Sequence, residues 1–413
     1  MVPLALAVLG AGLATGCRND LPRGSDASGG AAGTGGAPSG AGGLAGSGGS
    51  SGIGGAITGT GGAGTGSGGT AAGSGGARSG SGGATGGGGA TGGAGAGDRC
   101  GEAVYDAASP PGSLALTGNL GTHDPSIIAT GAATGGRYYI FQTGTGIPGK
   151  TSTNLTSWTA AAPVFTTNPS WIATQVPGAT DLWAPDISSF GGVFHLYYAV
   201  STFGSNHSCI GHATRAALDG GAGWTDMGSV VCSNAGGAND NWNAIDPNLA
   251  LDQAGTPWLV FGSFWGGIKM VKLTAAGARA DGTLYALAAR PDAGGAIEAP
   301  YIVRRCGYYY LFASFDLCCK GVDSTYKIAV GRATAITGPY ADKAGTPMMQ
   351  GGGTIIVQGG TRWKGPGHNA VLFDGGKAYN VYHSYDANAN GNPTLRISQI
   401  AWDDSGWPIS GGP

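Results

Sequence analysis

The sequence predicts an all-β protein, a five-bladed β-propeller preceded by a disordered linker rich in Gly, Ala, Ser and Thr. Three observations support this. A short aromatic pattern typical of a strand recurs five times, a polar residue heads a second apolar run before each copy, and no amphipathic helix of ordinary length follows residue 100. Repeats of several short strands without helices are typical of propellers. The competing fold, a two-sheet sandwich or jelly roll, would not explain the repeated polar heads.

The chain begins with an export-type segment, residues 1–17. This run is apolar, ends in small residues and is too short to span a membrane, so we expect a signal peptide. The letters "ATGC" at its end resemble the cleavage box of bacterial lipoproteins, with Cys17 as the residue that would carry the lipid. An ordinary cleaved secretion signal is the alternative. Either one predicts a protein that is secreted or lipid-anchored at the bacterial cell surface.

Residues 18–99 form the predicted linker. From Ala27 to Gly97 nearly every residue is Gly, Ala, Ser or Thr, and Arg78 is the only charged one. Such a segment has too little apolar surface to offset its chain entropy, so we expect a flexible coil. Every aromatic residue lies at or beyond Tyr105, which places the folded domain at residues 100–413.

Charge and composition argue against a nucleic-acid partner. The formal net charge is −2 and 11% of the residues are charged, so no basic stripe is available to contact phosphates. The Gly-rich segment also lacks the strand, helix and Lys context of a phosphate-binding loop. We therefore expect a monomer whose contact with a membrane, if any, is a lipid on Cys17.

The chain has seven cysteines, and their use fits an oxidising compartment. If Cys17 carries lipid, an even number remains for disulfides. Cys209 and Cys232 lie within one repeat and make a plausible local pair. Cys318 and Cys319 are adjacent and could bridge each other only through a strained ring, so their state stays open. No spacing of these cysteines resembles a zinc site.

Five aromatic runs are predicted to form the repeated strand of the blades. Each follows a Gly or turn signal and is dense in aromatic and β-branched residues. The runs are "YYIF" at 138, "HLYY" at 195, "WLVF" at 258, "YYLF" at 309 and "YNVY" at 379. Their last residues are 51 to 70 positions apart, a suitable length for one blade.

A second short run precedes each aromatic strand, and a polar residue near the start of this run is predicted to face the propeller axis. The runs are "HDPSII", "APDISS", "IDPNLA", "EAPYIV" and "GHNAVL", with the heads Asp124, Asp186, Asp246, Glu298 and His368. The first strand of each blade lines the axis, so these side chains should converge. Gathering so many like charges is costly unless they have chemical work to do, which marks a functional site.

At these residues the sequence closely resembles glycoside hydrolase family 43, and within it the endo-1,5-α-L-arabinanases. The resemblance extends from about Leu116 to Pro408 and rests on "HDPS", "DLWAPDIS", "NAIDPN", "GSFWGG", "IEAPYIV" and "GPGHNAV". It implies a five-bladed propeller, which agrees with the count of repeats. It also implies an inverting hydrolase that cleaves internal α-1,5-L-arabinofuranosidic linkages of arabinan, a side chain of pectin.

The resemblance implies a role for each of three carboxylates. Asp124 would be the general base that activates water, and Glu298 the general acid that protonates the departing oxygen. Asp246 would orient the acid and keep its pKa raised. Inverting hydrolysis needs a protonated acid and an ionised base roughly 6.5–9.5 Å apart, with water between them. A nearby like charge keeps the acid protonated near neutral pH.

Two other functions stay open. An exo-acting α-L-arabinofuranosidase or a β-xylosidase of the same family would share the three carboxylates, although "GSFWGG" and "GPGHNAV" favour arabinanases. A carbohydrate-binding propeller without catalysis is the alternative from another class. Such a protein should have lost at least one of the three carboxylates, and this chain keeps them all.

Five residues near the motifs are candidates for binding the sugar. Trp183 and Trp265 could stack on apolar sugar faces, although packing between blades is the alternative. Asn243 and Ser263 could bond sugar hydroxyls. Asp186 could contact the substrate or instead bond backbone groups in the axial channel.

His368 is the predicted metal residue. The family places a histidine at this head beside an axial metal, usually calcium, so the resemblance implies calcium as the cofactor. Calcium prefers oxygen ligands, and one imidazole with several waters would be an unusual site. A polar core histidine without any metal is the alternative.

Overall fold

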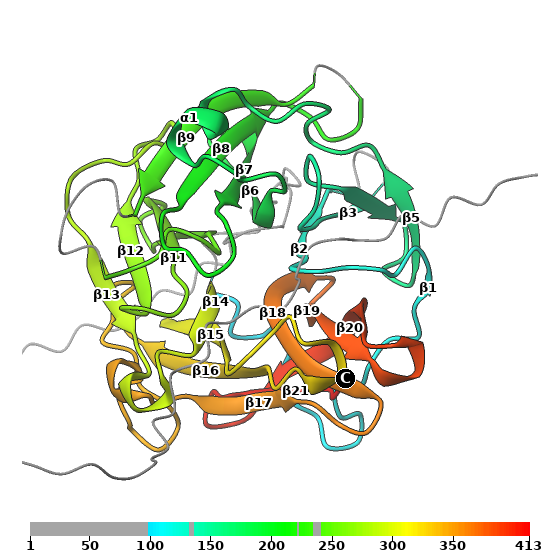
Figure 1. Ribbon diagram of the computed structural model, residues 1–413. Coiled ribbons are helices and arrows are strands. Elements are labelled where there is room, and N and C mark those ends of the chain that lie inside the picture. The colour runs from blue at the N-terminus through cyan, green and yellow to red at the C-terminus, as the bar shows by residue number, and fades with distance from the viewer. Residues whose placement is uncertain (1–97, 132–135, 221–222, 234–240) are drawn as a thin grey trace, which may run out of the picture. The chain divides into compact units, whose positions relative to one another are not determined.

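The computed structural model describes residues 98–131, 136–220, 223–233 and 241–413. Over these ranges the regular structure is almost entirely β and forms five sheets around a common axis (Figure 1), so the predicted five-bladed propeller is confirmed. The predicted signal peptide lies outside the described residues, as does the predicted linker except for its last two positions. No helix in the described ranges is long and apolar enough to cross a membrane.

Each blade is a sheet whose first strand lies nearest the axis (Figure 1). From the axis outwards, the first blade contains β2 (Ser126–Ala129), β3 (Tyr138–Phe141), β4 (Gly149–Ser152), β5 (Ser157–Ala161) and β1 (Thr117–Gly118). The second contains β6 (Trp183–Phe190), β7 (Val193–Val200), β8 (Cys209–Arg215) and β9 (Thr225–Cys232). The third contains β10 (Asn248–Leu251), β11 (Pro257–Phe261), β12 (Ile268–Lys272) and β13 (Tyr285–Ala288).

The fourth blade contains β14 (Ile297–Arg305), β15 (Tyr308–Phe315), β16 (Lys327–Ala333) and β17 (Thr354–Gln358). The fifth contains β18 (Trp363–Asp374), β19 (Lys377–Asp386), β20 (Asn392–Trp402) and β21 (Pro408–Ser410). Short helices lie in connections: α1 (Trp171–Gln175), η2 (Pro291–Ala293), η3 (Gly321–Asp323), η4 (Met348–Gln350) and η5 (Ala387–Ala389). Each inner strand contacts the inner strands of both neighbouring blades, so the ring is closed.

The five aromatic runs form all or part of the second strands β3, β7, β11, β15 and β19, as the repeats predicted. The aromatic runs within these strands are mostly apolar because apolar clusters fill the spaces between neighbouring blades. Tyr198 of β7 packs with Phe141 of β3 in the preceding blade. Leu311 of β15 packs with Val260 of β11 in the same way. A strand buried on both faces has a continuous apolar sequence, which explains why these runs were recognisable.

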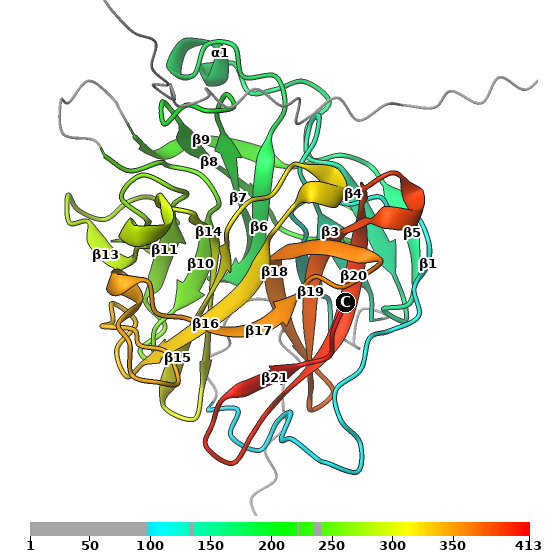
Figure 2. The same ribbon diagram turned by 60° about the horizontal axis from the view of Figure 1, so that its bottom comes forward.

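An N-terminal segment joins the last blade to the first. Leu114 donates its N–H to the carbonyl of Ile397 in β20 at 2.8 Å, and Leu395 of β20 donates to the carbonyl of Leu120 at 2.7 Å. Between these contacts, β1 pairs in parallel with β5 of the first blade. Figure 2 shows this cyan segment rising from the region of β21 to β1. Hydrogen bonds from residues 112–121 therefore tie the two ends of the ring together.

Two disulfides link the described cysteines. Cys209 and Cys232 pair across β8 and β9, which confirms the predicted local pair. Cys100 pairs with Cys306, which lies at the turn between β14 and β15, a pairing that the sequence did not reveal. Arg305 donates to the carbonyl oxygen of Cys100 at 2.9 Å beside this second disulfide. The first described residues are thereby bound covalently to the fourth blade.

Each blade has a non-glycine residue in the left-handed region within its inner strand or just before it. These residues are Asp124, Ala184, Asp246, Ala299 and His368, with φ between 45° and 58°. Asp124, Asp246 and His368 occupy this position as predicted, but Glu298 lies one residue before it and Asp186 two residues after it. The five polar heads therefore do not share one position relative to the left-handed residue of their blade.

The inner strand pairs irregularly beside both displaced heads, and it does so in β18 of the fifth blade as well. The register between first and second strands shifts between Trp183 and Asp186 in the second blade and between Glu298 and Tyr301 in the fourth. A bulge of this kind bends the strand and redirects a side chain, and it is found next to active sites. A left-handed non-glycine residue costs about 1–3 kcal/mol and persists only where its surroundings hold it.

Side chains of the preceding blade hold this strained position at four of the junctions between blades. Each accepts a hydrogen bond from the N–H of the left-handed residue in the next blade. The pairs are Thr143 with Ala184 (2.8 Å), Asp246 with Ala299 (3.0 Å), Ser314 with His368 (2.8 Å) and His383 with Asp124 (3.2 Å). The hydrogen bonds that hold the strained backbone are therefore the same bonds that join neighbouring blades.

A buried histidine pair lies in the second blade, against a loop of the third. Nδ1 of His195 in β7 is 2.9 Å from Nε2 of His212 in β8. The ring of Tyr197 stacks on His212, and its hydroxyl donates to the carbonyl of Gly277. Burial lowers the pKa of His195 to about 4. Burial, with a smaller contribution from His195, lowers the pKa of His212 to about 3.

We predict that this pair makes the stability depend on pH below about 6.5, the ordinary pKa of histidine in an unfolded chain. Both imidazoles stay neutral in the folded state, so the unfolded state binds more protons as the pH falls from about 6.5 towards 4. The free energy of unfolding should fall across that window, and His212→Gln should make the fall shallower. Urea unfolding at pH 7 and pH 5 measures this. His207→Gln, at an exposed histidine, is the matched control; an equal change of slope in both variants would contradict the prediction.

Candidate active site

Three blades each bring one carboxylate to the axis. Asp124 lies two residues before β2, Asp246 two residues before β10, and Glu298 is the second residue of β14. All three are buried, with 7% to 8% of each residue exposed. Each lies close enough to feel the charge of another: the negative charge of Asp246 raises the pKa of Glu298, and that of Asp124 raises the pKa of Asp246. The three carboxylates therefore form one cluster.

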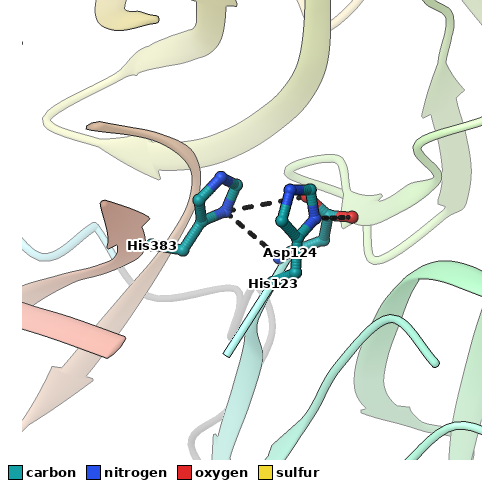
Figure 3. Close-up of side chains that lie close together, drawn as sticks. All are labelled: His123, Asp124 and His383. Carbon is teal, nitrogen blue, oxygen red and sulfur yellow. Dashed lines mark hydrogen bonds and ion pairs between the residues drawn. The ribbon is translucent and has the colours of Figure 1, made fainter. Parts of the chain in front are cut away.

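Asp124 lies beside the imidazoles of His123 and His383 (Figure 3) and also contacts Thr143 and His368. Its Oδ2 accepts from Thr143 Oγ1 at 2.6 Å and lies 2.8 Å from Nδ1 of His123. Its Oδ1 lies 3.1 Å from Nδ1 of His368. Burial alone would raise the pKa of this carboxyl, but the charges of His123 and His368 hold its pKa well below the usual range. Asp124 is therefore ionised at neutral pH.

Glu298 has the opposite environment. Burial, together with the negative charge of Asp246, raises the pKa of Glu298 to about 8. Ser263 donates to its Oε2 at 2.6 Å and partly opposes this rise. The hydroxyl of Tyr326, in the connection between β15 and β16, bonds the other oxygen. Glu298 is therefore protonated at neutral pH and fixed at both oxygens.

Asp246 lies between these two extremes. Burial raises its pKa to about 6, while the charge of His368 opposes the rise. Its Oδ2 accepts the N–H of Ala299, the residue that follows Glu298 along β14. Asp246 thus holds the backbone beside Glu298 and also places a negative charge near it.

One ionised and one protonated carboxyl in the same cluster can act together as base and acid. Environments that push the pKa values of two neighbouring groups apart are the usual basis for such a division of roles. An arrangement of this kind suits hydrolysis in which one group takes a proton from water and the other gives one to a leaving oxygen.

The sequence model of glycosyl hydrolases family 43 matches residues 118–408, the part of the chain that builds this cluster and all five blades. The chain belongs to this family. It is 47% identical over 291 residues to an extracellular endo-α-(1→5)-L-arabinanase of Bacillus subtilis, covering 69% of this chain and 86% of the relative. It is 42% identical over 302 residues to an extracellular exo-α-(1→5)-L-arabinofuranosidase of Cellvibrio japonicus, covering 69% and 85%.

A solved family 43 structure shows the same likeness. The endo-arabinanase from Bacillus licheniformis superposes with a TM-score of 0.67 at 50% sequence identity, covering 72% of this chain and 99% of that one. The likeness therefore includes nearly the whole of that enzyme.

Asp186 of this family 43 chain is bonded entirely within the protein. It is 2% exposed, and its carboxylate accepts from Ser126 Oγ (3.3 Å), Ser188 Oγ (2.9 Å), Asn248 Nδ2 (3.1 Å) and the N–H of Leu249 (2.8 Å). These partners come from three blades. The contacts favour the structural alternative for Asp186, a polar brace across the axial channel, over direct contact with a sugar.

The other four predicted sugar-binding residues lie in different settings. Trp265, in the connection between β11 and β12, is 44% exposed and so has a surface available for stacking. Trp183, the first residue of β6, is half-buried. Asn243 is 2% exposed and donates to the carbonyl of Ser205 at 3.4 Å. Ser263 bonds the carboxyl of Glu298, and its contact with the sugar stays a prediction.

Sequence reasoning missed several members of this cluster. His123 adjoins Asp124 in the quoted motif "HDPS" and could have been found there. Others come from second strands or from connections between strands, which carry no repeated signal. They are Thr143, Tyr326, His383 and Tyr385.

The predicted calcium was tested against the side chains that gather at the axis. The one group of three candidate ligands in the described ranges is His123, Asp124 and His383, whose ligand atoms lie within 4.8 Å of one another. Calcium takes six to eight oxygen ligands, and this group offers two imidazoles and one carboxylate. These residues do not fit a calcium ion enclosed by protein oxygens. No catalytic step below depends on a metal.

We predict that Thr143→Val lowers both stability and activity. Thr143 donates to Asp124 and accepts the N–H of Ala184 in the next blade, so valine of similar shape leaves a buried N–H without its partner. The expected loss in the free energy of unfolding is about 1–3 kcal/mol. Urea unfolding measures it. Thr159→Val, at an exposed threonine of β5, should change stability little; equal losses in the two variants would contradict this account.

Proposed function

We propose that this family 43 chain is an endo-acting 1,5-α-L-arabinanase that hydrolyses internal linkages of arabinan with inversion of configuration. The observation that carries the proposal is the opposite displacement of two pKa values in one buried cluster, down for Asp124 and up for Glu298. The similarity to endo-arabinanases at 47% and 50% identity supports the substrate and the endo mode.

In the proposed reaction, the ionised Asp124 accepts a proton from a water molecule as the water oxygen attacks the anomeric carbon. Glu298 donates its proton to the glycosidic oxygen as the bond from that oxygen to the anomeric carbon breaks on the opposite side. Attack and departure on opposite faces invert the configuration. Exchange of one proton with solvent at each carboxyl then restores the starting state.

Asp246 is proposed to position the acid rather than to react. Its bond to the N–H of Ala299 fixes the strand beside Glu298, and its negative charge favours the protonated form of Glu298. Ser263 and Tyr326 fix the orientation of that carboxyl.

An exo-acting mode is the second candidate, because a relative at 42% identity is named an exo-acting arabinofuranosidase. Digestion of linear debranched arabinan, sampled early, distinguishes the two. An endo enzyme releases a mixture of oligosaccharides from the start. A single small product at the earliest times would replace the endo assignment with the exo one.

Export is proposed from the two disulfides and from the relatives that are named extracellular. A lipid on Cys17 is the proposed anchor, and the linker at 18–99 would give the anchored enzyme reach to insoluble polymer. Fractionation of producing cells tests the anchor: Cys17→Ser should move the enzyme from the membrane fraction to the soluble one. Enzyme found in the soluble fraction with and without the substitution would instead indicate simple secretion.

Removing either proposed catalytic carboxyl should nearly abolish turnover. Asp124→Ala and Glu298→Ala should each lower kcat by a factor on the order of 10²–10⁴, the usual contribution of a positioned base or acid. Azide should partly restore Asp124→Ala by replacing the activated water, and the glycosyl azide should have inverted configuration. Product NMR reads the configuration; a retained configuration, or full activity in either variant, would overturn the assignment of roles.

Asp246→Asn should shift the alkaline side of the pH profile. Without the negative charge the pKa of Glu298 falls, so Glu298 loses its proton at lower pH and activity declines earlier as the pH rises. The profile of kcat against pH measures this. Asp292→Asn, at an exposed carboxylate of η2, is the control and should leave the profile in place. If the alkaline side of the profile stays in place in Asp246→Asn, Asp246 does not raise the pKa of Glu298 as proposed.

A calcium ion held largely by water beside His368 is also proposed, on the family resemblance. Dialysis against a strong chelator should then lower the melting temperature or the activity, and added calcium should restore it. His368→Gln should weaken this dependence. An enzyme that does not respond to the chelator would leave His368 as a charged partner of Asp124 alone.

A further inference from the structure

Two adjacent cysteines lie beside the proposed active site and are not used by the reaction. Cys318 and Cys319 are in the connection between β15 and β16, and their sulfurs are 2.6 Å apart. Both residues are partly buried. Sγ of Cys319 lies 3.7 Å from Nε2 of His123, the histidine that contacts Asp124.

The peptide bond between these cysteines begins a chain of contacts that ends at the proposed base. The N–H of Cys319 donates to the hydroxyl of Tyr385 at 2.8 Å. That hydroxyl is 2.9 Å from Nε2 of His123, whose Nδ1 is 2.8 Å from Oδ2 of Asp124. A change in the orientation of this one peptide group therefore reaches Asp124 through two side chains.

The same connection also supports the proposed acid. Tyr326, at its far end, bonds Glu298. At its near end Asp316 pairs with Arg290 at 2.7 Å and with Lys327 at 2.7 Å. Cys319 itself is in the left-handed region, with φ of 63°, a conformation that a non-glycine residue keeps only when its surroundings hold it.

We propose that Cys318 and Cys319 are a dithiol–disulfide modification site in the wall of the active site. In the structure the two sulfurs are not covalently bonded to each other, and the Cys319 N–H already donates to Tyr385. In the exported protein the pair closes as a vicinal disulfide, and the closed ring restricts the motion of this amide. The expected effect on turnover rests on the proposed function. The prediction that the two sulfurs form a disulfide does not depend on that function.

The closing reaction is thiol–disulfide exchange with a small-molecule disulfide. One cysteine thiolate attacks the reagent and releases one reagent thiol, and the second cysteine displaces the other half and releases the second thiol. The two cysteines are oxidised and the reagent is reduced. The ring contains the peptide bond itself, and adjacent Cα atoms are about 3.8 Å apart, less than the usual 4.4–6.8 Å of a disulfide. Strained disulfides are the more easily reduced ones, so this bond should open first.

Mass spectrometry of the full-length protein tests the site without any activity assay. Protein prepared in air and alkylated before digestion should give a peptide with Cys318 and Cys319 unmodified and lighter by two hydrogens than the dithiol. Mild reduction should make both alkylatable before any of the four cysteines in the other disulfides, and oxidised glutathione should close the pair again. Two alkylated thiols in the air-prepared protein that oxidised glutathione cannot close would overturn the proposal.

Turnover of linear arabinan tests the link to Asp124. Mild reduction should lower kcat roughly fivefold, the effect of loosening one net hydrogen bond, with little change in KM. The double variant Cys318→Ser, Cys319→Ser should resemble the reduced enzyme and ignore the reductant. Tyr385→Phe should also lower kcat and erase the difference between reduced and oxidised enzyme, although its cysteines still close.

Cys209→Ser combined with Cys232→Ser is the matched control, because it removes a disulfide in the outer part of the second blade and should keep the response. A response to reductant that survives in the Cys318, Cys319 double variant or in Tyr385→Phe would overturn the link. Absence of any arabinan hydrolysis would instead refute the proposed function and leave the mass-spectrometric result standing.

Discussion

The bond from a side chain of one blade to a strained amide of the next is the interaction on which the active site depends. At Ala184, Ala299, His368 and Asp124 the backbone is left-handed, and a side chain of the preceding blade accepts its N–H. The backbone at these residues is strained, and the bond makes that strain tolerable. Because each bond crosses a junction, the geometry of the site and the cohesion of the ring cannot vary independently.

Two of these side chains also contribute to the proposed chemistry. Asp246 holds the fourth blade through Ala299 and raises the pKa of the neighbouring Glu298. Thr143 holds the second blade and also bonds Asp124. Three buried carboxylates would repel one another, and His123 and His368 offset that repulsion on the side of Asp124. The histidines thus help to keep Asp124 ionised while Glu298, farther from their charge, stays protonated.

The sequence could predict those parts of the fold and the site that leave a pattern in nearby residues. Blade number was readable because strands such as β15 are apolar at nearly every position, packed between neighbours on both faces. The three carboxylates stood beside proline or alanine-proline at repeated places. The irregular pairing beside Asp186 and beside Glu298 could not be predicted, since it depends on how the first strand of each blade pairs with the second. The Cys100–Cys306 disulfide and the bond of Tyr326 to Glu298 join distant residues and leave no spacing signature.

The Cys100–Cys306 disulfide also decides where mechanical load enters the domain. A pull on the chain ahead of Asp98 reaches a covalent bond before it reaches the hydrogen bonds of residues 112–121 that close the ring. Force is diverted into the turn of the fourth blade, and the closing segment is shielded from being peeled away from β20. A tethered enzyme working on a solid polymer under flow would keep its ring intact for as long as that one sulfur bridge holds.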